Sequence, residues 1–93
     1  RRFLMKIIRV TAMWCMSCLA MKNIWKKVFA EYPDIEIIDF DIDFDQEKVK
    51  PYQVGQILPE LIVFKEGVEI RRIIGEKSKK EMKKILEELN EKH

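Results

Sequence analysis

The sequence has few of the residues that staple small secreted proteins or divide a chain into separate parts. Its 93 residues include only two cysteines, three glycines and three prolines. Two cysteines are too few for a disulfide-stapled scaffold, and so little glycine and proline excludes a collagen-like chain. Internal repeats, linkers and low-complexity segments are absent from the sequence. We therefore expect residues 1–93 to form a single domain.

The sequence also lacks an excess of either charge and any long hydrophobic run. It has 18 basic and 16 acidic residues, a net charge of +2, and 47% apolar residues. Dedicated nucleic-acid binders usually show a basic excess, and disordered chains combine low hydrophobicity with high net charge. Since a membrane span needs ~20 consecutive apolar residues, we expect a folded domain with neither a nucleic-acid nor a membrane partner.

A secretory signal is missing from the first residues. Lys6 and Arg9 interrupt the first apolar segment, so there is no continuous apolar core of a signal peptide. We expect a cytoplasmic protein. The alternative is an exported protein whose leader has been removed from the given chain.

Hydrophobic patterning predicts strands at 3–10, 35–40, 60–65 and 68–74, and helices at 15–31, at 45–53 and after Ser78. Glu66-Gly67 is typical of a hairpin turn, and Ser78 with Glu81 forms a capping box. The order strand, helix, strand, helix, strand, strand, helix predicts an α/β fold. Its mixed four-stranded sheet would join a parallel pair, linked by a helical crossover, to an antiparallel hairpin.

The two cysteines, Cys15 and Cys18, lie between the first predicted strand and helix. Residues three apart on a regular helix have Cβ atoms ~5–6 Å apart, whereas a disulfide needs ~3.8 Å. The pair can therefore close only if Cys15 stands at the helix start. There the free N–H groups and the helix dipole favour a thiolate, so we expect a lowered Cys15 pKa. Cys18, one turn further, should be more buried and more protonated.

Two other interpretations of the cysteine pair stay open. A zinc site needs about four ligands, and His93 is the only histidine, so zinc would have to be shared in a dimer. The cysteines could also be inert core residues, although this spacing beside a strand–helix–strand pattern is typical of a redox site. The acidic stretch 39–45 superficially resembles a calcium loop, but it lacks the required glycine and final glutamate.

Several segments together carry a resemblance to a known family. Trp14-Cys15-Met16-Ser17-Cys18 is similar to the Trp-Cys-x-x-Cys active site of the thioredoxin superfamily. Ile57-Leu58-Pro59 looks like the segment that ends in its cis-proline, and residues 61–67 and 73–75 look like its hairpin and the following strand end. The sequence resembles this superfamily over nearly all its length. The resemblance implies a thioredoxin-like fold that lacks the usual N-terminal strand and helix.

The resemblance implies a thiol:disulfide oxidoreductase in which Cys15 attacks and Cys18 resolves. The Cys15–Cys18 disulfide is then the redox centre, and no bound cofactor is needed. Pro59 would be cis and lie against the cysteines, with the Leu58 backbone pairing with an extended substrate by strand addition. Trp14 would be an exposed apolar flank of the site. The alternatives are an ordinary strand-start proline and a tryptophan that simply packs.

The implied partners are protein disulfides as substrates and a reductase or thiol pool as electron donor, and we expect a monomer. We favour a disulfide reductase. An oxidase or isomerase in an oxidising compartment, and a non-catalytic binding module that could hold zinc as a dimer, stay open. The glutaredoxin pattern of Cys-Pro-x-Cys, Thr-Val-Pro and Gly-Gly-x-Asp is absent.

The chain departs from the family pattern at positions expected to tune the thiols. Met16-Ser17 replaces the usual Gly-Pro between the cysteines, so the redox potential is not transferable. Arg9 stands where the family has a buried Asp, and Asp39 stands approximately where that Asp has a Lys partner. The charge pair is therefore expected to be swapped. Arg9 under the site would favour a Cys18 thiolate; the alternative is an Arg9 that reaches the surface.

A further departure directly follows the expected cis-proline. Glu60 stands where the family commonly has Thr. An acid near Cys15 would oppose formation of the thiolate and disfavour acidic substrates.

Overall fold

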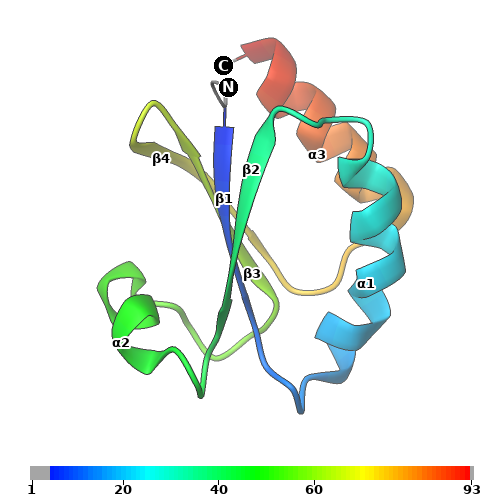
Figure 1. The fold of residues 1–93 in the computed structure, drawn as a ribbon. Coiled ribbons are helices and arrows are strands. Elements are labelled where there is room, and N and C mark those ends of the chain that lie inside the picture. The colour runs from blue at the N-terminus through cyan, green and yellow to red at the C-terminus, as the bar shows by residue number, and fades with distance from the viewer. Residues whose placement is uncertain (1–4, 93) are drawn as a thin grey trace.

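The computed structural model describes residues 5–92, which form a four-stranded sheet with helices on both faces (Figure 1). The elements are β1 (Met5–Thr11), α1 (Met16–Phe29), β2 (Ile35–Asp41), α2 (Gln46–Val49), the 3-10 helix η1 (Lys50–Tyr52), β3 (Glu60–Lys65), β4 (Val68–Ile74) and α3 (Lys79–Lys92). This order confirms the predicted α/β fold. Within residues 5–92, none of the helices combines the length and apolarity required to cross a bilayer.

The predicted boundaries differ from the structure mainly at helix ends. The helix predicted over 15–31 begins at Met16 and ends at Phe29. The helix predicted over 45–53 is two short pieces, because Pro51 lacks the N–H that would continue α2, and the chain tightens into η1. The first two residues of the strand predicted at 3–10, and His93, lie outside the described residues.

The sheet has the strand order β2-β1-β3-β4. Strand β1 runs parallel to β2 and antiparallel to β3, and β3 and β4 form an antiparallel hairpin, as predicted. Ile7, Ile8 and Val10 of β1 are fully buried, because helices cover both faces of this strand. A nearly continuous apolar run is what a strand buried on both faces requires.

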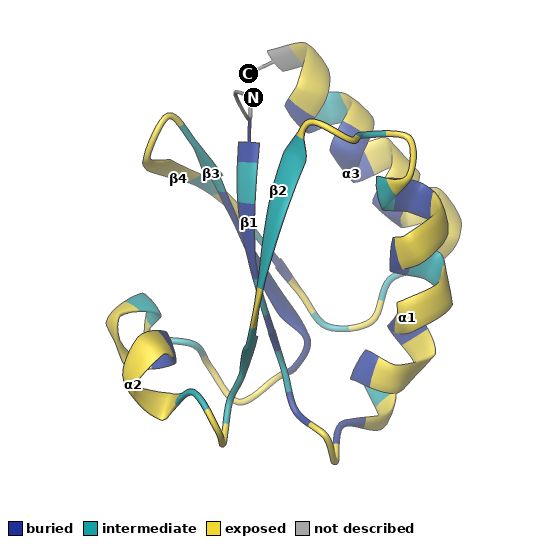
Figure 2. Cartoon of the chain, in the orientation of Figure 1, coloured by how far each residue is buried: buried dark blue, intermediate teal, exposed yellow. Residues whose placement is uncertain are grey.

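Each face of the sheet has its own core (Figure 2). On one face, Met21 and Trp25 of α1 and Met82 and Leu86 of α3 pack against strand residues such as Leu61. The second core lies on the α2 face and continues around the end of β1 to include both cysteines. Its members are Ile8, Val10, Ala12, Cys15, Cys18, Val49, Leu58 and Ile62. The cysteines are therefore part of the packed interior rather than of a surface loop.

The β3–β4 hairpin contains a two-residue turn and a bulge. Glu66 and Gly67 both have positive φ angles, 52° and 80°, which is the geometry of a type I′ turn. Beyond the turn, Phe64 lies opposite Glu69, whereas Val63 lies opposite Arg71. One extra residue, at position 70, is thus inserted in β4, and it reverses the face on which every later residue of the strand lies.

The predicted capping box begins α3. The Ser78 backbone N–H donates to Glu81 Oε1 at 2.8 Å, and the Glu81 N–H donates to Ser78 Oγ at 3.1 Å. The hydrogen bond from the Ser78 backbone, followed by that with its side chain, lowers the pKa of Glu81 below its ordinary value of 4.5. The ionised carboxylate therefore stabilises the folded state.

We predict that Glu81→Gln destabilises the protein at pH 7 but not at pH 3. Because the pKa of Glu81 is lower in the folded state, its stabilisation is complete above the unfolded value of 4.5 and disappears as the pH falls through the folded value. Urea unfolding from pH 7 to pH 3 measures this difference. Ser78→Ala should cost about 1 kcal/mol at pH 7 through loss of the cap. A wild-type-to-Gln difference that stays constant with pH would contradict the prediction.

Candidate active site

Cys15 is the residue that caps the N-terminus of α1. Its backbone is extended, with φ −85° and ψ 111°, and its sulfur accepts a hydrogen bond from the Cys18 N–H at 3.1 Å. The Leu19 N–H then donates to the Cys15 carbonyl, which is the first bond of the helix. The sulfur thus lies among the otherwise unpaired N–H groups of the first turn, as the spacing predicts.

Cys18 is the more buried of the two cysteines, with 4% exposure against 8% for Cys15. Burial is the largest cause that raises the pKa of Cys18 to about 12, and the hydrogen bond with Cys15 adds to it. This confirms the expectation of a buried, protonated second thiol. At neutral pH the Cys18 sulfur carries a proton that has to leave before it can act as a nucleophile.

Trp14 lies beside the cysteines and is largely exposed, at 65%. Its indole Nε1 donates to Asp43 Oδ2 at 2.7 Å, which fixes the ring on the loop that follows β2. The exposure agrees with an apolar flank and not with simple packing. Other apolar side chains near the cysteines in sequence are exposed as well: Met13, Met16 and Leu19.

The Leu58–Pro59 segment has the backbone geometry that the resemblance implies, while the expected position of Pro59 against the cysteines stays a prediction. The peptide bond between Leu58 and Pro59 is cis. Leu58 is buried in the same apolar cluster as Cys15 and Cys18. The Pro59 carbonyl accepts a hydrogen bond from the Gly75 N–H at 2.8 Å, which ties this segment to the end of β4. The structure therefore brings Leu58 to the cysteines, and its role in binding substrate stays a prediction.

The swapped charge pair is present. The Arg9 guanidinium donates to both Asp39 carboxylate oxygens, at 2.6 and 3.0 Å, and lies 4.8 Å from the centre of the Trp25 ring. All three residues line a cavity of about 550 Å³ together with Cys15 and Cys18. Arg9 is neither fully exposed nor alone under the site, because Asp39 engages its charge.

The expected effect of Arg9 on Cys18 needs a correction. We predicted that this cation would favour the Cys18 thiolate, but the pKa of Cys18 is raised. Burial, followed by the interactions with Cys15, raises the Cys18 pKa, backbone hydrogen bonds oppose this rise, and Arg9 is not among the causes. The physical reason is that the guanidinium is paired with Asp39 through two hydrogen bonds, which leaves desolvation as the dominant influence on the sulfur.

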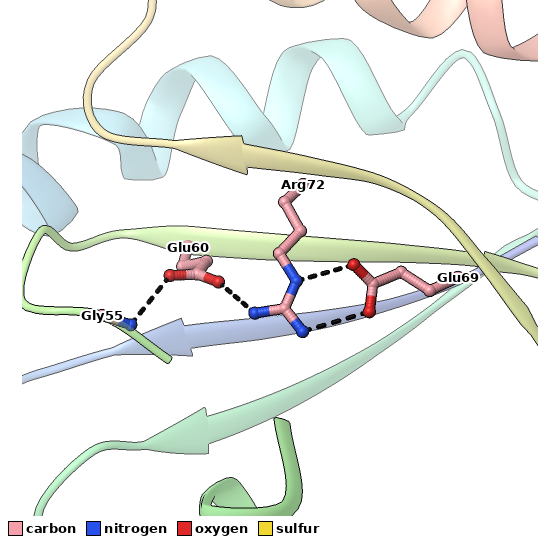
Figure 3. Close-up of polar contacts among 4 residues, drawn as sticks. All are labelled: Gly55, Glu60, Glu69 and Arg72. Atoms are coloured by element: carbon pink, nitrogen blue, oxygen red, sulfur yellow. Dashed lines mark hydrogen bonds and ion pairs between the residues drawn. The ribbon is translucent and has the colours of Figure 1, made fainter. Parts of the chain in front are cut away.

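Glu60 also differs from the expectation. Its side chain is only 2% exposed, and its carboxylate binds the Arg72 guanidinium at 2.7 Å and the Gly55 N–H at 3.3 Å (Figure 3). Arg72 in turn donates to both Glu69 oxygens, at 2.7 and 3.1 Å. We expected an acid acting on Cys15; instead, a paired and buried carboxylate has its charge compensated by Arg72.

Met16 and Ser17 lie in the first turn of α1, Met16 exposed and Ser17 half-buried. Neither is among the groups that shift the Cys18 pKa. Their influence on the redox potential stays a prediction.

The acidic stretch after β2 is a hydrogen-bonded loop. Asp41 Oδ1 accepts from the N–H groups of Asp43 and Phe44, at 2.8 and 3.0 Å, and Asp45 Oδ2 accepts from the Asp41 N–H at 2.8 Å. Such bonds are typical of Asp in turns. Across the part of the chain that the structure describes, no group of three or more His, Cys, Asp or Glu side chains is arranged to hold a metal ion.

Three partners of the site were not singled out from the sequence: Arg72, the Gly55 N–H, and Asp43 as the acceptor for Trp14. The acid-apolar alternation places Asp43 near the end of a strand, which is a usable signal. No sequence pattern identifies Arg72 as a partner of Glu60, because the bulge in β4 decides whether Arg71 or Arg72 faces Glu60.

Comparison with known proteins matches this arrangement to one family. The sequence model of the family described as Thioredoxin matches residues 4–88. A thioredoxin of Chlamydia trachomatis is 34% identical over 80 residues, which cover 86% of this chain and 78% of that protein. A thioredoxin of Mycobacterium tuberculosis is 31% identical over 84 residues, covering 85% and 72%. The crystal structure of thioredoxin from Trypanosoma brucei brucei superposes with a TM-score of 0.84 at 23% identity, over 97% of this chain and 78% of that one.

We predict that the two thiols differ in reactivity. In Cys15→Ser, the remaining Cys18 should react with iodoacetamide very slowly at pH 7, because burial is the largest cause of its raised pKa and survives the substitution. In Cys18→Ser, the remaining Cys15 should react much faster. The measurement is the rate of alkylation between pH 6 and pH 10, followed by mass spectrometry. Equal rates for the two variants would contradict the assignment.

Proposed function

The chain belongs to the thioredoxin family, whose members are thiol–disulfide oxidoreductases, and on that premise we propose that it reduces disulfides in other proteins. The observation that carries the proposal is the unequal pair of thiols. The Cys15 sulfur accepts an N–H at the start of α1, while Cys18 is buried and has a pKa of about 12. This arrangement makes the Cys15 sulfur available to attack a substrate disulfide and keeps the Cys18 sulfur protonated until the second step.

The reaction consists of two thiol–disulfide exchanges. In the first, the Cys15 thiolate attacks one sulfur of the substrate disulfide, a Cys15–substrate bond forms, and the other substrate sulfur leaves as a thiolate and takes up a proton. In the second, Cys18 loses its proton and attacks the Cys15 sulfur. A Cys15–Cys18 disulfide forms, and the second substrate sulfur leaves as a thiol. The substrate gains two electrons, and the cysteine pair loses two.

The surface around the sulfurs suits an extended polypeptide. Trp14, Met13 and Met16 offer exposed apolar area next to Cys15, and Ile57 does so next to Leu58. We propose that the Leu58 backbone pairs with the substrate chain by strand addition, since main-chain hydrogen bonds bind many sequences with little selectivity. The near-zero net charge of the protein adds no strong preference for acidic or basic substrates.

We propose that the cysteine pair alone carries the electrons, without a bound cofactor, and that a reductase or a dithiol pool returns it to the reduced state. A reductase of this kind works in a compartment where thiols are kept reduced, which is the reason for our prediction of a cytoplasmic location. We also propose that the protein acts as a monomer.

The test is insulin reduction driven by dithiothreitol. We predict that wild type accelerates the reaction, that Cys15→Ser falls to the uncatalysed rate, and that Cys18→Ser accumulates mixed disulfides that can be trapped and identified. An inactive wild type, or a fully active Cys15→Ser, would overturn the enzymatic proposal. Mixed disulfides trapped on Cys18 in Cys15→Ser, but not on Cys15 in Cys18→Ser, would reverse the order of attack.

The reduction potential of the Cys15–Cys18 couple decides whether the protein reduces or oxidises its substrates. Equilibration against a glutathione series should give a value at or below the cytosolic glutathione range of about −220 to −260 mV. A value near the −120 to −180 mV typical of oxidases and isomerases, also approximate, would contradict a reducing role.

A further inference from the structure

We infer that Glu60 and Arg72 are a positioning pair for this reaction, holding the loop 53–58 so that the Leu58 backbone meets the substrate. Together with the Gly55 N–H, we call this pair the Glu60–Arg72 clamp (Figure 3). The inference rests on the proposed function, since it concerns how a protein substrate is bound. It assigns a role to a buried charge that the exchange chemistry does not use.

The clamp ties the loop on both sides of Leu58. Glu60 stands two residues after Leu58, and its Oε1 atom accepts from the N–H of Gly55, three residues before Leu58, at 3.3 Å. Among the described residues, this is the hydrogen bond that holds the backbone of 54–58, since the other backbone bonds of the region end at Gln53 and Pro59. The Glu60 side chain therefore fixes a loop that the sheet itself does not hold.

Arg72 is what keeps the Glu60 carboxylate in this place. A carboxylate that is 2% exposed requires a compensating charge, and Arg72 Nη1 supplies it at 2.7 Å from Oε2. The remaining nitrogens of the Arg72 fork bind Glu69 (Figure 3), and these two bonds restrain the guanidinium from rotating away from Glu60. One carboxylate oxygen is thus anchored to β4, and the other is left to hold Gly55.

The clamp reaches the site through the loop and not through the sulfurs. Glu60 lies on the sheet face of Ile62, in the neighbourhood of the cluster that contains Leu58. It is not among the groups that shift the Cys18 pKa. Loss of the clamp should therefore impair substrates that need the Leu58 backbone and spare small disulfides that do not.

The experiment compares two substrates and two variants. Insulin carries its disulfides on polypeptide chains, whereas 2-hydroxyethyl disulfide has no peptide backbone. For Glu60→Gln and Arg72→Met, we expect kcat/KM for insulin to fall on the order of tenfold, mainly through a higher KM, as for a misplaced binding group. The rate with 2-hydroxyethyl disulfide should stay within about twofold of wild type, because the thiols are untouched.

Two further variants separate positioning from stability. Arg71→Met changes the neighbouring arginine, which binds Glu88 of α3 at 3.3 Å on the opposite face, and should leave both substrates unaffected. In the double variant Glu60→Met with Arg72→Met, an apolar pair replaces the buried charges and should restore folding. Its KM for insulin should stay high, because Gly55 has lost its acceptor. If Glu60→Gln or Arg72→Met does not fold, the double variant still tests whether the clamp positions the loop.

Amide hydrogen exchange of the segment 53–59 tests the clamp independently of any activity assay. Exchange should speed up in Glu60→Gln and Arg72→Met but not in Arg71→Met. Unchanged exchange, an equal loss with both disulfide substrates, or no loss with either would overturn the inference. If wild type does not reduce insulin while exchange responds as expected, the proposed reductase function fails and the clamp as a holder of the loop stands.

Discussion

The starting point of α1 determines the chemistry of the site. Cys15 and Cys18 are one turn apart, and inside a regular helix they would be equivalent neighbours on one face. Because α1 begins at Met16, Cys15 stands outside the helix with its sulfur against the Cys18 N–H, and Cys18 stands inside it. One boundary thereby makes two identical side chains chemically different, one directed at the helix N-terminus and the other shielded by packing.

The sheet supports this boundary from both faces. Strand β1 is buried on both sides and ends just before the cysteines, so the turn at Ala12 to Cys15 starts from a fixed point. Two charge pairs flank it. Arg9 and Asp39 lie on the face covered by α1, whereas Glu60 and Arg72 lie on the other face. Each pair satisfies a buried or half-buried charge close to a segment that carries the site.

Much of this arrangement follows from local sequence patterns. The strands 60–65 and 68–74, the turn at Glu66-Gly67 and the capping box at Ser78 are encoded by neighbouring residues, and their positions agree with the structure. The fold and the cysteine pair could be predicted for the same reason: a strand–helix junction with this spacing has few alternatives. The break of the second helix at Pro51 is a local effect of the same kind, although the pattern alone predicts one continuous helix.

The electrostatic details could not be predicted in this way, because they depend on pairing between distant segments. Arg9 and Asp39 could be matched through the resemblance, but the strength of burial around Cys18 depends on packing from the whole cluster. The partner of Glu60 depends on register. If β4 paired with β3 from the turn onward without a bulge, Arg71 would lie on the face of Glu60. The extra residue at position 70 shifts the register and places Arg72 there instead.

The bulge in β4 also affects how readily this protein aggregates through the edge of its sheet. Strand β4 is an edge of the sheet, and an open edge is a template on which another chain can add a strand and begin to aggregate. The extra residue interrupts the regular spacing of hydrogen-bonding groups along that edge, and Glu69, Arg71 and Arg72 place charges beside it. A protein proposed to bind extended chains at Leu58 thus has, at the β4 edge of its sheet, a bulge and charges that disfavour strand pairing with such chains.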